Sequence, residues 1–142
     1  MPSLFIESCP SAFCCSSKMG EVCFIVSSSE HKDWKQHSKF GIKVPVFNSL
    51  AETATFIYES GWFIGNDSGV GHLASNLGIP TLSLILRPSL ARSWRPNFCM
   101  GKVILPTRLL LIRKFKEKFW KYFVSVNKVY KGFLDLKSAY EK

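Results

Sequence analysis

A glycine-rich loop carries the residue types in this sequence that are best suited to chemistry. Residues 65–72 read Gly-Asn-Asp-Ser-Gly-Val-Gly-His. Glycines let the backbone approach a ligand closely, and the N–H groups of Ser68 and Gly69, where a helix is expected to begin, suit a phosphate. Asp67 offers a carboxylate that accepts hydrogen bonds from sugar hydroxyls. His72 follows about one helical turn further on, where its imidazole would reach the same ligand.

The same residues also fit a purely structural role. Asp67-Ser68-Gly69 is good helix-capping sequence, and His72 fits an ordinary partly buried histidine equally well. Spacing alone leaves both alternatives open. The pattern matches neither GxGxxG nor GxxxxGK[ST], so it gives no support to a dinucleotide-binding or P-loop site.

Short apolar runs around this loop predict the strands of a parallel sheet. The clearest are residues 22–26, 62–64 and 81–86, and residues 102–105 form a weaker fourth run. Stretches with helical periodicity separate them, which is the βαβ alternation of an α/β fold. The glycine-rich loop leaves the second run and opens a helix, so it lies at the carboxyl end of a strand, where such folds bind ligands.

Two helices flank the central strand of this pattern. Ser49 and Glu52 fit a capping box, with Ser49 as the N-cap and Glu52 reaching back, and Gly61 follows as a stop. Residues 70–77 resume helical spacing after the loop and end at Gly78. We therefore expect a Rossmann-like parallel sheet with flanking helices.

The chain divides into three parts by composition. Residues 1–20 show no periodicity and are expected to be poorly structured, and residues 21–105 form the α/β domain. Residues 106–142 hold a basic and aromatic segment and then a C-terminal amphipathic helix.

The net charge of +9 comes from the C-terminal part. Residues 1–86 carry five basic and seven acidic residues (net −2), whereas residues 87–142 carry 14 basic and three acidic ones (net +11). Residues 113–123 interleave cations with aromatic rings, which fits a helix packed on the domain, a contact with an anionic membrane, or nucleic-acid binding. Nucleic acid is the least favoured of the three, because no nucleic-acid motif accompanies the charge.

The cysteines and the hydropathy indicate a cytoplasmic protein, soluble or peripheral on the inner face of the cytoplasmic membrane. The five cysteines have neither metal-ligand spacing nor a disulfide pattern, and we expect no metal and no cofactor. No apolar run approaches the roughly 18 residues that span a bilayer, and residues 1–17 lack the features of a secretory signal.

Residues 65–85 closely resemble the donor-site signature of the glycosyltransferase family 9 proteins, the lipopolysaccharide heptosyltransferases and their relatives. In that family an aspartate, a Ser or Thr, a glycine, two variable residues and a histidine precede a Leu-Ala helix and Gly-x-Pro. The matching positions are Asp67, Ser68, Gly69, His72, Leu73, Ala74, Gly78 and Pro80. The resemblance is specific over residues 49–86 and weaker on either side.

The resemblance implies the C-terminal half of a GT-B fold that binds a nucleotide-diphosphate sugar. It implies inverting, metal-independent sugar transfer to a lipopolysaccharide or glycolipid acceptor. Asp67 would contact the sugar or the loop, Ser68 and Gly69 would offer amides to phosphate, and His72 would position the donor. Glu30 stands where the family places an acid that contacts the ribose, although it also fits a charged residue opening a surface helix.

Three arginines follow the last clear strand. Arg87, Arg92 and Arg95 are candidates for contacts with the diphosphate, near the same sheet edge as Asp67, and serve solubility equally well.

Two departures from the family pattern limit the expected activity. No strand and lysine-bearing loop are found before Val22, and the acceptor domain with its general base is absent. No residue is a convincing catalytic base, so we expect a fragment with little activity alone. The alternatives are another GT-B enzyme, such as a UDP-sugar epimerase, or a non-catalytic basic module that binds membrane or nucleic acid.

Overall fold

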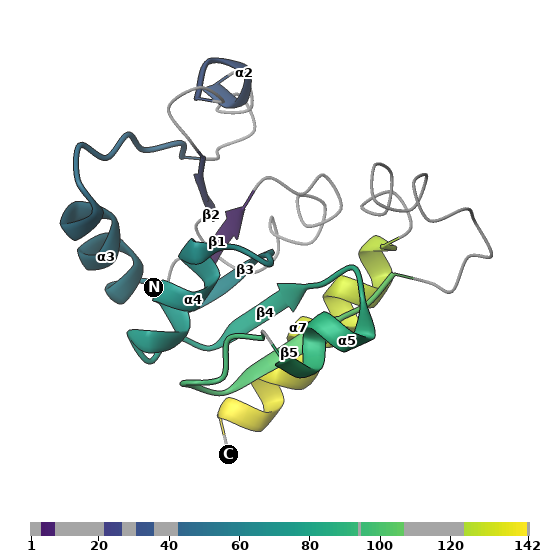
Figure 1. Cartoon of the computed structure of the whole chain (residues 1–142). Helices are drawn as coiled ribbons and strands as arrows, with labels where there is room; N and C mark the ends of the chain where they lie inside the picture. Colours follow the sequence, from purple (N-terminus) through teal and green to yellow (C-terminus); the bar gives the residue numbers. More distant parts are fainter. Residues whose placement is uncertain are drawn as a thin grey trace.

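Five parallel strands form one sheet in the order β2-β1-β3-β4-β5 (Figure 1). The computed structural model describes residues 4–7 as backbone, and residues 22–26, 31–35, 43–93, 95–106 and 124–141 in full. The strands are β1 (Leu4–Glu7), β2 (Val22–Ile25), β3 (Trp62–Asn66), β4 (Thr81–Leu84) and β5 (Gly101–Ile104). The four strands predicted from apolar runs are confirmed, with ends shifted by one or two residues.

Strand β1 corrects the expectation for the N-terminal segment. Leu4 is in register with Val22 of β2 on one side and with Trp62 of β3 on the other. The expectations that residues 1–20 are poorly structured and that no strand precedes Val22 are therefore wrong for residues 4–7. A run of four residues is too short to show periodicity, and pairing on both sides with distant segments supplies the order that local sequence does not.

Helices cover both faces of the sheet. The helices of the described residues are α2 (His31–Lys35), α3 (Leu50–Tyr58), α4 (Gly69–Asn76), α5 (Pro88–Ser93) and α7 (Val126–Tyr140), of which α2 projects beyond the sheet (Figure 1). The connections β3-α4-β4 and β4-α5-β5 step across the sheet in the same direction, and right-handed crossovers therefore place α4 and α5 on the same face. Helix α7 lies behind β4 and β5 (Figure 1), and this α/β arrangement confirms the predicted fold class.

The strands divide their side chains between two cores. Trp62, Ile64, Leu82 and Leu84 join the cluster under α7, whereas Phe63 joins the cluster under α3 and α4. This alternation follows from the two-residue period of a strand. Buried faces on both sides are what a parallel sheet requires, which explains why its strands read as continuous apolar runs.

Helix α3 confirms the predicted capping of its first turn. The Glu52 N–H donates to Ser49 Oγ at 3.1 Å, so Ser49 is the N-cap. The Glu52 carboxylate accepts from the Asn48 N–H at 2.8 Å, one residue earlier than in a standard capping box.

Helix α7 confirms the predicted C-terminal amphipathic helix and belongs to the main core. Val129, Phe133 and Leu136 are buried on its inner face. A Cβ added at Gly132 would lie 2.6 Å from Ile104 Cδ1, so the helix approaches β5 more closely there than a larger residue would allow. The basic and aromatic residues 113–123 lie outside the described residues.

Candidate functional site

The glycine-rich loop lies at the carboxyl edge of the sheet, as predicted. Strand β3 ends at Asn66, which is in register with Leu84 at the end of β4, and α4 begins at Gly69. Asp67 and Ser68 form the short turn between them. This turn therefore opens onto the edge where parallel α/β sheets bind ligands.

Ser68 fixes the first turn of α4. Its Oγ accepts from the Gly71 N–H at 3.3 Å, and its carbonyl accepts from the His72 N–H at 3.2 Å. Helical geometry leaves the N–H groups of Gly69 and Val70 without an acceptor inside the helix. They lie at the positive end of the helix dipole, where an anion is stabilised.

The two glycines of α4 have different surroundings. A Cβ added at Gly69 would meet nothing within 4 Å, whereas one at Gly71 would lie 3.3 Å from Phe63 Cε1 and 3.5 Å from the Asn66 carbonyl oxygen. Gly71 therefore serves the packing of α4 on β3. Gly69 is exposed, and the open space beside it leaves room for a ligand to approach the backbone.

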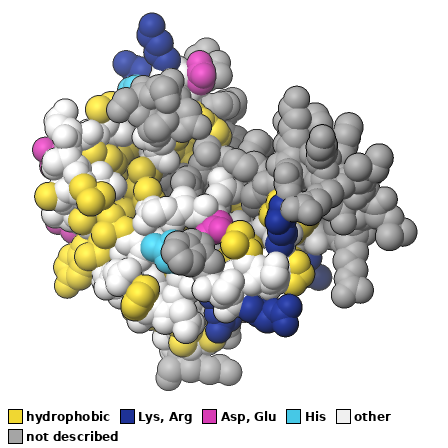
Figure 2. Space-filling model, in the orientation of Figure 1, with side chains coloured by type: hydrophobic (Ala, Val, Ile, Leu, Met, Phe, Trp, Pro, Cys, Tyr) yellow, Lys and Arg dark blue, Asp and Glu magenta, His cyan; other side chains and the backbone are white. Residues whose placement is uncertain are grey.

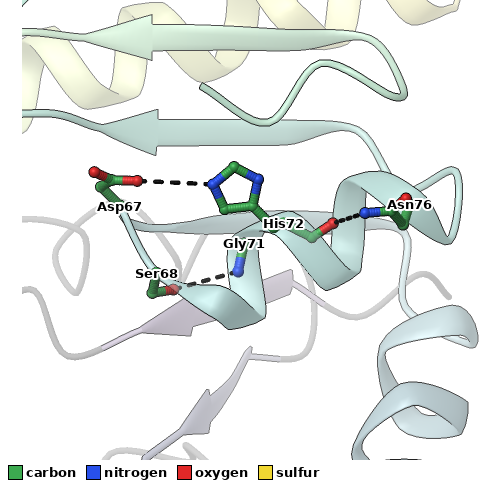
Figure 3. A network of polar contacts seen from close by, with 5 residues as sticks. All are labelled: Asp67, Ser68, Gly71, His72 and Asn76. Atoms are coloured by element: carbon green, nitrogen blue, oxygen red, sulfur yellow. Dashed lines mark hydrogen bonds and ion pairs between the residues drawn. The ribbon is translucent and has the colours of Figure 1, made fainter. Parts of the chain in front are cut away.

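Asp67 and His72 face each other across the start of α4 (Figure 3). Asp67 Oδ1 lies 3.9 Å from His72 Nε2, and the two side chains are 20% and 26% exposed. This separation is too long for a direct hydrogen bond. Asp67 Oδ1 is buried and has no hydrogen-bond partner within the described part of the chain. The carboxylate is thus able to accept a hydrogen bond from a ligand at this edge.

Two polar side chains near the end of α4 make hydrogen bonds that sequence reasoning missed. Ser75 is fully buried, and its Oγ accepts from the N–H groups of Phe98 and Cys99 at 3.0 and 3.2 Å. Asn76 Nδ2 donates to the His72 carbonyl at 2.9 Å (Figure 3). Ser75 is buried and anchors α4 to the loop before β5, and a serine within a helix carries no sequence signal for such contacts, because its partners lie more than 20 residues away.

Helix α4 ends in a Schellman motif. Gly78 has φ +82°, and the N–H groups of Gly78 and Ile79 donate to the carbonyls of Ser75 and Ala74. The stop predicted at Gly78 is confirmed. A glycine is favoured there because other residues rarely adopt a positive φ.

The structure brings together four of the predicted donor-binding residues. Asp67, Ser68, Gly69 and His72 lie within one turn and the start of one helix. Glu30, the predicted ribose contact, lies outside the described residues.

The three arginines do not all lie at the same edge. Arg87 is exposed and follows β4 by three residues, at the carboxyl edge shared with Asp67. Arg95 precedes Pro96, whose carbonyl oxygen is 3.6 Å from the Cβ position of Gly101 at the beginning of β5. The loop that contains Arg95 therefore lies toward the amino edge, and the expectation that all three arginines lie near Asp67 is wrong for Arg95. Arg92, in the last turn of α5, lies between these positions.

The described residues also bear on metal binding, membrane spanning and the state of the cysteines. Among them, no group of three or more His, Cys, Asp or Glu side chains could hold a metal ion. No helix in the described ranges is both long and apolar enough to cross a membrane. Neither Cys23 nor Cys99 forms a disulfide within the described part of the chain.

Comparison with solved structures identifies the fold. A family 9 glycosyl transferase from Veillonella parvula DSM 2008 matches with a TM-score of 0.71 and 17% identity, over 95% of this chain and 46% of that one. The chain has the fold of about half of a family 9 glycosyltransferase. The heptosyltransferase WaaC of E. coli, solved with ADP, matches with a TM-score of 0.69 and 12% identity, over 95% and 44% of the two chains.

A third match extends over nearly the whole chain. It is the ADP-heptose lps heptosyltransferase II of E. coli, with a TM-score of 0.73 and 15% identity, over 99% of this chain and 48% of that one. This chain therefore spans less than half the length of the family 9 structures that it matches. No family model matches the sequence, and no curated protein does. The likeness to family 9 glycosyltransferases is one of fold.

Proposed function

We propose that this chain is the donor-binding domain of a family 9-like glycosyltransferase and binds a nucleotide-diphosphate sugar at residues 67–72. The observation that carries the proposal is the pairing of a capped helix start with the Asp67 and His72 side chains at the carboxyl edge of the sheet. One of the matched structures was solved with ADP, which is consistent with a nucleotide ligand for this fold.

The start of α4 would bind the diphosphate of the ligand, and the Asp67 and His72 side chains would bind its sugar. The N–H groups of Gly69 and Val70 would receive the diphosphate at the positive end of α4, and Arg87 would add a cation at the same edge. Asp67 Oδ1 would accept a hydrogen bond from a sugar hydroxyl, and His72 would position the same sugar from the next turn. Glu30 remains our proposal for the ribose contact.

The proposed reaction is an inverting transfer. The acceptor hydroxyl oxygen would form a bond to the anomeric carbon of the sugar, the bond to the diphosphate oxygen would break on the opposite face, and the hydroxyl proton would pass to a base. The helix amides and Arg87 would stabilise the charge on the leaving diphosphate. We therefore propose metal-independent donor binding, unchanged by EDTA.

The acceptor would be bound elsewhere. In the matched structures more than half of each chain lies outside the common fold, and we propose that a counterpart of that region binds a lipopolysaccharide or glycolipid acceptor and supplies the base. We propose that the sugar transfer takes place on the cytoplasmic side of a membrane. The chain alone should then show little or no turnover.

Thermal unfolding with a panel of ligands tests this proposal. A ligand that binds only the native state at a concentration 100 times its Kd stabilises it by about 2.7 kcal/mol, which raises the Tm by several degrees. We expect this for one class among ADP-, UDP- and GDP-sugars, and no comparable rise with the free sugar. No rise with any nucleotide sugar would reject the proposal.

A further inference from the structure

The surface around α5 combines exposed arginines with exposed apolar side chains. We call it the α5 surface, and its members are Arg87, Leu90, Arg92, Arg95, Phe98 and Met100. Figure 2 shows basic side chains gathered over this part of the molecule with apolar ones beside them. The proposed donor site uses only Arg87, because Arg92 and Arg95 lie successively farther from the loop at Asp67.

No Asp or Glu lies close to Arg92 and Arg95 in the sequence. Residues 68–116 contain eight Lys or Arg and no Asp or Glu. Within the described part of that stretch, Lys102 is already paired with Asp135 of α7. Lys102 is in register with Leu82, so its side chain lies on the α7 side of the sheet, opposite α5. Arg92 and Arg95 are both exposed and have no acidic neighbour in this stretch of sequence, so their end of the α5 surface is basic.

Two apolar members of this surface are well exposed on a fixed loop. Phe98 is 72% exposed and Met100 43% exposed, although their loop is held firmly by the hydrogen bonds from Phe98 and Cys99 to the buried Ser75. A fixed loop that presents a phenyl ring and a thioether three and five residues after an arginine has the chemistry of a membrane interface. There, guanidinium groups pair with phosphates, and apolar side chains enter the boundary of the hydrocarbon region.

We infer that the α5 surface docks on an anionic lipid bilayer, with Arg92 and Arg95 on lipid phosphates and with Phe98 and Met100 inserted beside them. A bilayer accommodates both components, whereas a nucleic acid would pair with the arginines and leave the exposed Met100 in water. Docking in this way does not depend on donor binding. It would place the carboxyl edge of the sheet, with Asp67 and Arg87, next to the membrane at one end of α5.

Co-sedimentation with lipid vesicles tests the inference directly. The full chain is mixed with vesicles of pure phosphatidylcholine, or of phosphatidylcholine with about 30% phosphatidylglycerol, in the absence of any nucleotide. Each basic residue near an anionic surface contributes about five-fold in partitioning, so Arg92→Ala with Arg95→Ala should weaken binding to the anionic vesicles about 25-fold. Phe98→Ser should weaken it as well, without changing the salt dependence.

A matched control removes the same charge elsewhere. Lys35→Ala with Lys131→Ala takes two exposed cations from α2 and α7, and we expect it to change vesicle binding less than two-fold per residue. All these side chains are exposed, and circular dichroism verifies that the variants fold.

Four results would overturn the inference. The wild type fails to bind anionic vesicles, or the two double variants lose binding equally, or Arg92→Ala with Arg95→Ala binds as well as the wild type. Preferential binding to a random-sequence RNA that the anionic vesicles do not displace would also overturn it, in favour of nucleic acid.

Discussion

Asp67 Oδ1 and His72 Nε2 lie 3.9 Å apart, one on the turn after β3 and the other in the first turn of α4 (Figure 3). At this distance the pair contributes little to folding, because partly exposed ion pairs are worth about 0–1 kcal/mol. The same two side chains lie beside N–H groups that helical geometry leaves unbonded. We therefore expect the two side chains to contribute more to ligand binding than to the stability of the fold.

Replacing the carboxylate should therefore separate binding from folding. We expect Asp67→Ala to change the free energy of unfolding by less than about 1 kcal/mol. It should weaken binding of the donor about 10- to 100-fold, because hydrogen bonds to charged groups contribute about 1.5–3 kcal/mol. Denaturant titration and calorimetry measure the two effects. Glu59→Ala, which removes an exposed carboxylate from the end of α3, is the control and should alter neither.

The two glycines of α4 offer a paired test of the open space at the helix start. Gly69→Ala adds a Cβ where nothing lies within 4 Å, so the variant should be at least as stable as the wild type yet bind the donor more weakly. Gly71→Ala places its Cβ against Phe63 and should be less stable than Gly69→Ala by about 1–3 kcal/mol. Urea titration ranks the variants. Equal stability of the two would show that Gly71 is not required for packing, and undiminished donor affinity in Gly69→Ala would contradict a ligand there.

Helix α7 is expected to be indispensable to the α/β core. Phe133 is 3% exposed, and its ring lies 5.2 Å from that of Trp62 in a T-shaped contact, so Phe133→Ala should cost about 3–5 kcal/mol. The neighbouring Leu134 is 43% exposed, and Leu134→Ala should cost much less. Thermal unfolding compares the two. If they were equally mild, α7 would be a separate appendage and not part of the core.

Strand β1 is expected to be essential despite its length of four residues. Ile6→Pro removes a backbone N–H from the centre of the sheet and leaves a partner carbonyl unsatisfied, at a cost of at least about 1–3 kcal/mol. Ile6→Val keeps the N–H and should be far milder. Native-state hydrogen exchange in β2 and β3 reads out the effect. Protection in both strands that is unchanged by Ile6→Pro would show that β1 does not pair with them.

The parts of the fold that sequence predicted are those with a local physical signal. Buried strands such as Thr81–Leu84 read as apolar runs, and the caps at Ser49 and Ser68 reflect hydrogen bonds within three residues. The four residues 67, 68, 69 and 72 lie within six consecutive positions, so the turn and the first turn of α4 are enough to bring them together.

Features that depend on distant partners escaped prediction. Strand β1 is ordered by pairing with β2 and β3, which lie later in the chain. Ser75 is buried, and its hydroxyl accepts a bond from the loop before β5. The position of Arg95 depends on α5, which carries the chain from the end of β4 back to the amino edge, where β5 begins. The six-residue α5 that makes this return is too short to show a helical period in the sequence.

The most direct test of the account is a calorimetric titration of the wild-type chain with ADP-, UDP- and GDP-sugars, repeated with Gly69→Ala. We predict saturable one-to-one binding of one nucleotide class by the wild type and a clear loss of affinity in Gly69→Ala at undiminished stability. No binding of any nucleotide sugar, or equal affinity in the two proteins, would contradict a donor site at the start of α4.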